Sequence, residues 1–534
     1  MFSINFTTIP GRTGRSLFRS PVLRTFWLAL ATASIGWHSV LSVDAAEVLT
    51  RPNIVYILAD DLGPGDVAAF NRQSKIATPN MDKLASQGMR FTDAHSGSAV
   101  CTPTRYGVLT GRYAWRTRLQ KGVCWGYSPP LIAKDRLTVA SLVRRFGYRT
   151  ACVGKWHLGL KWGLEDEQNP PLGNQDETWE KIDFTQAISS GPNEIGFDYF
   201  FGIPASLDMH PHVYIKNHRV TMVPTEILPG SVGKKYWRSG PVGDDFKHVE
   251  VLDKLTEKAV EFIQAQTADK PFLLYFPLTA PHNPIIPQQR FQNQSGLNEW
   301  GDFVMQVDWT VGEVMNALQQ SGLAKNTLFI VTSDNGATPS ADFPFLVEHG
   351  HNPSHVYRGH KADLFEGGHR VPFIARWPKV IEVGSSCSDT ICHTDLLATV
   401  ADITDFTLPA DAGEDSVSMM PLFEQTATIP IRDATVHHSI DGSFAIRRGN
   451  WKLLLCSGSG GWSEPRAAKA RKAKLPTIQL YDLASDIAES TNVASEHPDV
   501  VEQLISLLKR YVDQGRSTPG RPQANDVKVQ IGAS

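Results

Sequence analysis

The sequence predicts an α/β protein: a large mixed, mostly parallel sheet flanked by helices, followed by a small C-terminal α+β domain with an antiparallel sheet. From Asn53 onward, short apolar runs alternate with segments of helical periodicity, a pattern typical of a sheet covered on both faces. After about residue 425 this alternation gives way to a hairpin pattern and one amphipathic helix. The chain has 534 residues, which is long enough for two such parts.

The first 46 residues are typical of a secretory signal peptide. Four arginines between residues 12 and 24 precede the apolar run 26–37, and small residues follow around Ala45. The apolar run is shorter than the roughly 20 residues that cross a bilayer, so a cleaved signal is favoured over an uncleaved membrane anchor. We therefore expect an exported protein, periplasmic or secreted, with no stable membrane insertion.

The expected catalytic domain spans residues 47–425. Its strand patterns alternate with amphipathic segments, as parallel strands joined by helices require. The strand patterns lie at residues 53–61, 148–157, 271–282 and 326–336, and the helical patterns lie at 81–88, 136–147, 248–266 and 303–322.

The expected C-terminal α+β domain spans residues 426–520. Within it, the basic segment 464–476 is expected to be a solvated, disordered-looking loop rather than a polyanion-binding patch. Residues 521–534 are expected to form a flexible tail. The remaining patterns are a hairpin at 444–456, a strand with a turn at 478–486 and an amphipathic helix at 498–514.

The balance of charge gives no indication of a nucleic-acid partner. Lys and Arg number 52 against 55 Asp and Glu, which gives a formal net charge of -3. The six cysteines show no CxxC or metal-finger spacing. In an oxidising compartment some could pair, and Cys387 and Cys392 are the nearest couple.

Polar, chemically capable side chains stand at the ends of four strand patterns. In open α/β sheets, ligands bind outside the carboxyl ends of the strands, so four such endings at one edge predict an active site. The residues are Asp60 and Asp61, Lys155 and His157, His282, and Asp334 and Asn335.

Two of these strand ends supply hard oxygen ligands of the kind that Ca²⁺ or Mg²⁺ prefers. Asp60 and Asp61 are adjacent carboxylates that repel each other, and a divalent cation between them would relieve this. Taken alone, that stretch could equally be a solvated turn with a helix cap. Asp334 and Asn335 at a second strand end favour metal binding.

Cys101 does not suit such a site, because a soft thiolate prefers Zn or Cu(I) to a hard cation. Either Cys101 is unrelated to the metal site, or it is no longer a cysteine in the mature protein.

The stretch "CTPTRYGVLTGR" at 101–112 resembles the Cys-x-Pro-x-Arg signature of the sulfatases. In that family the cysteine is oxidised to Cα-formylglycine by a dedicated formylglycine-generating enzyme, which becomes an expected maturation partner. Thr104 is a mild departure, since Ser is commoner there. Five further blocks resemble the family in order: "PNIVYILADDLG", "GKWHLG", "PFLLYFPLTAPHNP", "TSDNG" and "RGHKADLFEGGHRVPF".

The resemblance implies a fold like that of alkaline phosphatase and a complete site for sulfate ester hydrolysis. It implies that Arg105 lies against the formylglycine and the carboxylates, and that Lys155, His157, His282 and Lys361 are catalytic. It implies one calcium ion held by Asp60, Asp61, Asp334, Asn335 and the modified Cys101.

The chemistry of a sulfate ester is consistent with these roles. The negative oxygens of the ester must be neutralised before attack, which the cation with Lys155, His282 and Lys361 would achieve. One hydroxyl of the hydrated aldehyde would attack sulfur, and His282 or Lys361 would protonate the leaving alcohol. His157 would then take the proton of the second hydroxyl, expelling sulfate.

We therefore expect an exported sulfatase acting on a sulfate monoester of a sulfated carbohydrate or an aryl alcohol. Two alternatives remain: a phosphate or phosphonate ester hydrolase of the same superfold, and a non-catalytic sulfated-glycan binder. Specificity is expected from loops 160–195 and 204–245 and from the C-terminal domain.

Two histidine-rich stretches are interpreted as secondary features. His210 and His212 could line the substrate pocket. The remaining four have no common zinc spacing and sit among Gly, Asn and Pro, which favours a loop with structural or substrate-facing roles. They are His349, His351, His355 and His360.

Overall fold

The computed structural model describes residues 51–168 and 178–532. The expected signal peptide, residues 1–46, lies outside these ranges, so it stays a prediction. Most of loop 160–195 is described, apart from its residues 169–177. Among the described residues, no helix has both the length and the apolar character needed to cross a membrane.

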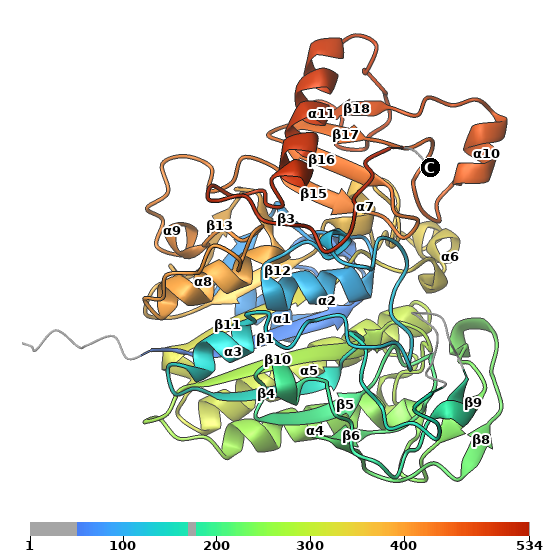
Figure 1. The fold of residues 1–534 in the computed structure, drawn as a ribbon, viewed down its shortest axis with the longest axis vertical. Helices are drawn as coiled ribbons and strands as arrows, with labels where there is room; N and C mark the ends of the chain where they lie inside the picture. The colour runs from blue at the N-terminus through green and yellow to red at the C-terminus, as the bar shows by residue number, and fades with distance from the viewer. Residues whose placement is uncertain (1–50, 169–177, 533–534) are drawn as a thin grey trace, which may run out of the picture. The chain divides into compact units, whose positions relative to one another are not determined.

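A ten-stranded mixed sheet forms the centre of the fold (Figure 1). Its five middle strands, β11, β1, β10, β4 and β5, are all parallel, while β12 and β6 join antiparallel at either side. This confirms the predicted large, mostly parallel sheet. In spatial order the strands are β13 (Ser385–Cys387), β2 (Met89–Phe91), β12 (Phe373–Arg376), β11 (Thr327–Ser333), β1 (Asn53–Asp60), β10 (Phe272–Pro281), β4 (Arg149–Lys155), β5 (Tyr199–Ile203), β6 (Ile215–Lys216) and β7 (Arg219–Val220).

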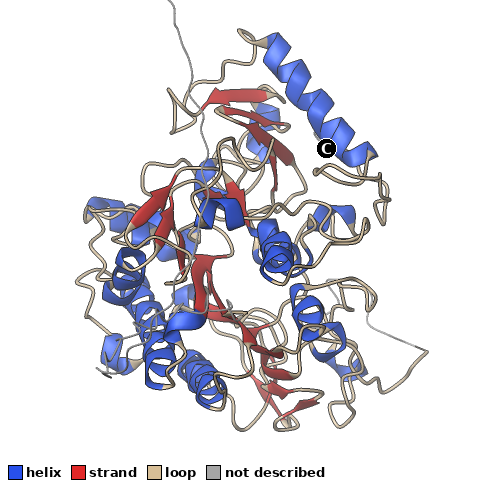
Figure 2. Cartoon of the chain, turned by 90° about the vertical axis from the view of Figure 1, so that its left-hand side faces the viewer, coloured by secondary structure: helices blue, strands red, loops and turns tan. Residues whose placement is uncertain are grey.

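Helices cover both faces of this sheet (Figure 2), and each face has its own hydrophobic core. Alternate residues of β1 point to opposite faces, so Tyr56 packs in one core and Ile57 in the other. The Ile57 face packs against α1 (Pro79–Ser86), α4 (Val251–Gln264) and α5 (Glu299–Gln320), and the Tyr56 face against α2 (Cys101–Thr110), α3 (Val139–Arg144) and α8 (Leu396–Ile403).

The C-terminal part is a four-stranded antiparallel sheet with one long helix, as predicted. The strands are β15 (Thr435–His438), β16 (Phe444–Arg448), β17 (Trp451–Leu454) and β18 (Gln479–Asp482). Helix α11 (Pro498–Asp513) buries Leu504 and Leu508 against this sheet, in a core that also takes Tyr113 and Trp115 from the catalytic part.

Shorter elements complete the fold. The two-stranded pairs are β3 (Ala94–His95) with β14 (Ile391–Cys392), and β8 (Glu226–Leu228) with β9 (Gly240–Val242). The short helices are α6 (Phe343–Glu348), α7 (Glu366–His369), α9 (Met420–Phe423) and α10 (Ala467–Lys472).

Two expectations for the C-terminal region need correction. The basic segment expected to be a loop contains helix α10, which buries Ala470 while its Lys and Arg side chains face solvent. Part of the expected flexible tail is anchored: Asp526 pairs with Arg112 at 3.0 Å, and its N–H donates to Arg116 O at 2.8 Å. The domain boundaries as a whole stay predictions.

The structure also shows the state of the cysteines and the first residues of two predicted helices. All six cysteines are described, and all are free thiols, Cys387 and Cys392 included. Helix α5 begins four residues earlier than its apolar pattern, because Asn298 caps it by accepting from Trp300 N at 3.1 Å. Thr138 caps α3 in the same way.

Candidate active site

The sheet brings four sequence-predicted positions to one edge. Because β1, β10, β4 and β11 run parallel, their carboxyl ends meet there. Asp60 ends β1, Lys155 ends β4, Asp334 directly follows β11, and His282 directly follows β10. Residues more than 270 positions apart in sequence, Asp61 and Asp334, are joined by a 3.2 Å hydrogen bond from the Asp61 N–H.

Three fully buried carboxylates lie at the centre, and each is paired with its own buried cation. The cations come from different elements: β4, α2 and the loop before α7. Lys155 Nζ lies 2.6 Å from Asp60 Oδ2, Arg105 Nη2 lies 2.7 Å from Asp334 Oδ2, and Lys361 Nζ lies 2.7 Å from Asp61 Oδ1.

This crowding shifts the pKa values of two carboxyl groups in opposite directions. Burial and the neighbouring Asp60 charge raise the pKa of Asp334 to about 7. Burial would also raise the pKa of Asp60, but Lys155 and other nearby cations hold it well below its usual range. The structure therefore concentrates negative charge where a divalent cation would be stabilised.

Two unsatisfied oxygens show that the donor set fits a hard cation. Asn335 Nδ2 donates to Asp61 Oδ1 at 2.7 Å and to Gly336 O at 3.0 Å, which leaves Asn335 Oδ1 buried without a hydrogen-bond partner. Asp60 Oδ1 is also buried and unpartnered. Asp60, Asp61 and His282 can each offer one ligand atom within 4.8 Å of the others.

Cys101 is the first residue of the buried helix α2. Pro103 is tolerated two residues later because the first turn of a helix has no partner for its N–H groups. The helix ends at Gly111, whose φ of 63° is a left-handed cap. Burial raises the pKa of the Cys101 thiol, so the encoded side chain remains a neutral thiol and a weak nucleophile.

Arg105 lies one helical turn after Cys101 and on the same face of α2. Its Nη1 donates to Lys155 O at 3.0 Å and its Nη2 to Asp334 Oδ2 at 2.7 Å, while Asp60 Oδ1 lies 3.6 Å away. The planar guanidinium thus ties α2 to two strand ends, which explains the spacing of Cys101 and Arg105.

His157 is held as a neutral imidazole beside the site. Its Nε2 donates to Cys124 O at 2.7 Å, while its Nδ1 is buried and has no hydrogen-bond partner. Burial, with the charges of Lys155 and Arg105, lowers the pKa of His157 well below its usual range. A neutral Nδ1 without a partner can accept a proton.

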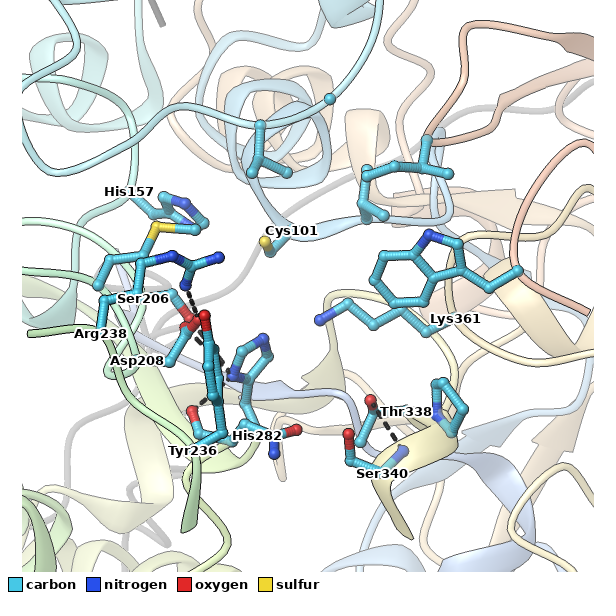
Figure 3. A pocket seen from close by; sticks show the side chains of 18 of the residues that line it. Cys101, His157, Ser206, Asp208, Tyr236, Arg238, His282, Thr338, Ser340 and Lys361 are labelled. Atoms are coloured by element: carbon cyan, nitrogen blue, oxygen red, sulfur yellow. Dashed lines mark hydrogen bonds and ion pairs between the residues drawn. The ribbon is translucent and has the colours of Figure 1, made fainter. Parts of the chain in front are cut away.

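His282 and Lys361 reach the site from the other side (Figure 3). His282 Nδ1 lies 2.7 Å from Asn283 O and 3.3 Å from Ser206 Oγ, and its Nε2 lies 3.7 Å from Asp61 Oδ2. Figure 3 shows Cys101, His157, His282 and Lys361 around one space. They line a cavity of about 820 Å³, which is within the size range of small-molecule sites.

Three site residues other than glycine adopt left-handed backbone conformations. The φ angles are 73° at Asp61, 57° at His157 and 81° at Ala362, next to Lys361. Such conformations cost energy and persist where the surrounding structure imposes them, most often at functional sites. Here His157 and Lys361, the neighbour of Ala362, line the cavity, while Asp61 lies among the buried carboxylates.

Several cavity residues were missed by the sequence motifs. Ser206, Asp208, Tyr236 and Arg238 come from loop 204–245, and Trp462 comes from the C-terminal part. The loop was expected to matter, but its residues have no periodicity or motif. In the sequence, the stretch that contains Asp208 is distinguished only by His210 and His212.

The histidines of that stretch do not belong to the cavity lining. His210 Nδ1 lies 3.2 Å from Tyr127 Oη, and His212 Nε2 lies 2.9 Å from Arg238 O, so both support the loop from behind. In the second histidine-rich stretch, His351 Nε2 lies 2.9 Å from the buried Asp66 carboxylate, and His349 stacks on Phe345. These contacts correspond to structural roles.

The fold and the site together define a hydrolase of a charged tetrahedral ester, with oxygen ligands for a cation and additional basic groups around it. The profile of the Sulfatase family matches residues 52–406. The chain belongs to the sulfatase family, and it is a sulfuric ester hydrolase.

Individual relatives agree with this assignment. The N-acetylgalactosamine-6-O-sulfatase of Bacteroides thetaiotaomicron is 34% identical over 515 residues, covering 89% of this chain and 96% of that one. Human arylsulfatase A is 31% identical over 505 residues, covering 89% and 91%. A solved structure described under the metabolism of multiple glycosaminoglycans by Bacteroides thetaiotaomicron superposes with a TM-score of 0.74 at 33% identity, covering 86% of this chain and 99% of that one.

Proposed function

We propose that this protein is an exported sulfatase that uses Cα-formylglycine at position 101 and a bound calcium ion to hydrolyse sulfate monoesters. The observation that carries the proposal is the setting of Cys101. Its buried thiol stands within electrostatic range of Lys155, Lys361, Asp334 and Asp60, beside unsatisfied hard oxygen atoms. A thiol suits neither those oxygen ligands nor their cation, whereas a hydrated aldehyde suits both.

Hydrated formylglycine, when present, would supply a geminal diol as the nucleophile, and a bound calcium ion would supply a Lewis acid for a sulfate oxygen. The chain's own residues position the reactants. Arg105 contacts both the Asp334 and the Asp60 carboxylates and holds them in place. Lys155, His282 and Lys361 surround the position of the sulfate and neutralise its oxygens.

Three residues are placed to move protons. Lys361 and His282 lie on the cavity side, where the alcohol leaves, and either can protonate it. His157 Nδ1, neutral and without a hydrogen-bond partner, can accept the proton whose removal regenerates the aldehyde and releases sulfate.

We infer that the substrate is a sulfated carbohydrate or an aryl sulfate. Support comes from the relatives, which are named for N-acetylgalactosamine 6-sulfate and for aryl sulfates. Export is inferred from the charge and hydropathy pattern of the first 46 residues, and it suits a polymeric or extracellular sulfated substrate.

The mass of the peptide that contains residue 101 tests the modification. After expression with a formylglycine-generating enzyme, that peptide should lose one sulfur and two hydrogens and gain one oxygen. Fully active enzyme with an intact thiol would contradict the proposal.

Turnover tests the reaction and separates it from the two alternatives. We expect hydrolysis of nitrophenyl sulfate to exceed that of nitrophenyl phosphate, and C101A to lose nearly all of it. Preference for the phosphate ester would favour the phosphohydrolase alternative. A glycan binder would bind equally well after C101A and turn over neither ester.

A further inference from the structure

Asp208 carries an unsatisfied carboxylate oxygen in the wall of the active-site cavity. The side chain is only 9% exposed, and its Oδ2 accepts a hydrogen bond from Arg238 Nη1. Its Oδ1 is buried and has no hydrogen-bond partner. A buried carboxylate oxygen without a donor is costly, and because Asp208 lines the cavity, a donor on a ligand bound there would satisfy it.

Arg238 is held rigidly in its position against Asp208. Its guanidinium lies 4.5 Å from the ring centroid of Trp125 and 5.3 Å from that of Tyr236. Its backbone N–H donates to Asp208 O at 2.9 Å, and its carbonyl contacts His212 Nε2. The acid and the base therefore form a preorganised pair.

The pair lies next to the position where the alcohol leaves. Asp208 Oδ1 is 3.9 Å from His282 Nδ1. Ser206, two residues earlier, lies 3.2 Å from Lys155 Nζ and 3.3 Å from His282 Nδ1. Figure 3 shows Asp208, Arg238 and Tyr236 on the His282 side of the cavity, beside the space in front of Cys101.

We propose that Asp208 and Arg238 form a subsite that recognises a hydroxyl or amide N–H group on the leaving alcohol, so that the enzyme selects a polyhydroxylated ring over an aryl alcohol. This inference rests on the proposed function. Arg238 already neutralises the carboxylate, so the open oxygen needs a neutral donor rather than a second cation. The rings of Trp125 and Tyr236 add apolar surface for the face of a sugar.

The leaving alcohol of an aryl sulfate lacks the hydroxyl or amide N–H group that Asp208 would recognise. An aryl sulfate has no hydroxyl or amide beside the ester and leaves Asp208 Oδ1 unsatisfied. A site built to pair with a donor discriminates strongly against analogues without one. Loss of a hydrogen bond to a charged group corresponds to about 10- to 100-fold in kcat/KM.

The test compares D208N with the wild-type enzyme on two kinds of substrate. The first is a panel of monosulfated hexoses and N-acetylhexosamines; the second is cyclohexylmethyl sulfate and nitrophenyl sulfate, which offer no donor. We expect D208N to lose about 10- to 100-fold more in kcat/KM on the preferred sugar sulfate than on the donor-free esters. D245N is the matched control, since Asp245 lies on the same loop, is exposed and bonds Thr221 outside the cavity.

The wild-type enzyme provides a second measurement that does not depend on the variant folding. It should cleave the preferred sugar sulfate at least about 10-fold better than cyclohexylmethyl sulfate. Equal losses of D208N on both kinds of substrate, or no wild-type preference for sugars, would overturn the subsite while leaving the sulfatase proposal intact. Failure of the wild-type enzyme on every sulfate ester would instead overturn the proposed function and the subsite with it.

Discussion

Lys155 donates from Nζ to Asp60 Oδ2 at 2.6 Å, while Oδ1 of the same buried carboxylate has no hydrogen-bond partner. Asp334 and Asp61 are also paired with buried cations, each supplied by a different element. Asn335 Oδ1 is a second buried oxygen without a hydrogen-bond partner. The protein cations therefore balance the charge of the carboxylates and leave two oxygens without a partner, as ligands of a hard cation would be.

The open oxygens predict that calcium stabilises the folded protein. A ligand that binds only the native state contributes about 2.7 kcal/mol at one hundred times its Kd. We expect added Ca²⁺ to raise the Tm and a chelator to reverse the effect. In D60N the calcium-induced rise in Tm should disappear, because the substitution removes the negative charge of a carboxylate that would bind the cation.

The measurement is the Tm against calcium concentration, so any effect of D60N on the Tm without calcium does not interfere. D513N is the control, since Asp513 is exposed on α11. A full calcium shift in D60N, or none in the wild-type protein, would contradict the proposed site.

The buried ion pair of Arg105 should contribute much more to the free energy of unfolding than the exposed ion pair of Arg290. Its guanidinium and the Asp334 carboxylate are both fully buried, so R105M leaves uncompensated charge and should lower the free energy of unfolding by about 3–5 kcal/mol. The bidentate pair of Arg290 with Asp253 is exposed by 44% and 27%, so R290M should cost less than about 1 kcal/mol. Urea denaturation checks both variants; similar losses would show that burial does not decide the cost.

The metal-side residues could be predicted from sequence because parallel strands bring their carboxyl ends together. Asp60 and Asp334 were identified from runs that end in charge, and β1 and β11 are neighbours in the sheet. Asp208 and Arg238 could not be found in this way. They lie on an irregular loop, and Arg238 is positioned by stacking on Trp125. No periodic pattern in the sequence predicts a contact of this kind.

Helix α10 is a regular element that the sequence prediction missed. Its composition is so basic that the segment was interpreted as a solvated loop, yet Ala and Lys are good helix formers. Ala470 is the one buried residue of this helix, so the segment shows no hydrophobic stripe in the sequence.

We expect the buried ion pairs of Lys452 to hold the C-terminal sheet to the catalytic part. From β17 its Nζ reaches Glu366 Oε1 at 3.0 Å and Glu489 Oε1 at 2.8 Å, with all three side chains fully buried. K452M leaves Glu489 without its cation, while Glu366 keeps Arg370 at 2.7 Å, and it should cost about 3–5 kcal/mol. Adding E489Q should restore part of this loss by removing the uncompensated charge.

The check is the free energy of unfolding of K452M, E489Q and the double variant, treated as a cycle. R448A is the exposed comparison, since Arg448 and Asp433 are exposed by 53% and 42%. Additive losses in the double variant would mean that Lys452 and Glu489 do not interact.

The stability of the protein in acid should depend on the buried His393. Its Nε2 donates to Ser333 O at 2.7 Å, so its Nδ1 accepts from Tyr56 Oη at 2.9 Å, and the neutral ring is fully satisfied. Burial lowers the pKa of His393 to about 4; the Ser333 hydrogen bond opposes this shift, and the charge of His95 adds to it.

Between its ordinary pKa of 6.5 and the folded value of about 4, the unfolded chain binds the His393 proton and the native protein does not. Stability therefore falls as the pH falls through this window, by about 3 kcal/mol for this group once the pH is below both values. We expect H393Q, whose amide can still donate to Ser333 O, to show a shallower loss of unfolding free energy from pH 7 to pH 4.5 in urea. H349Q, at an exposed position, should keep the wild-type slope. An unchanged slope in H393Q would show that His393 is not held neutral by burial.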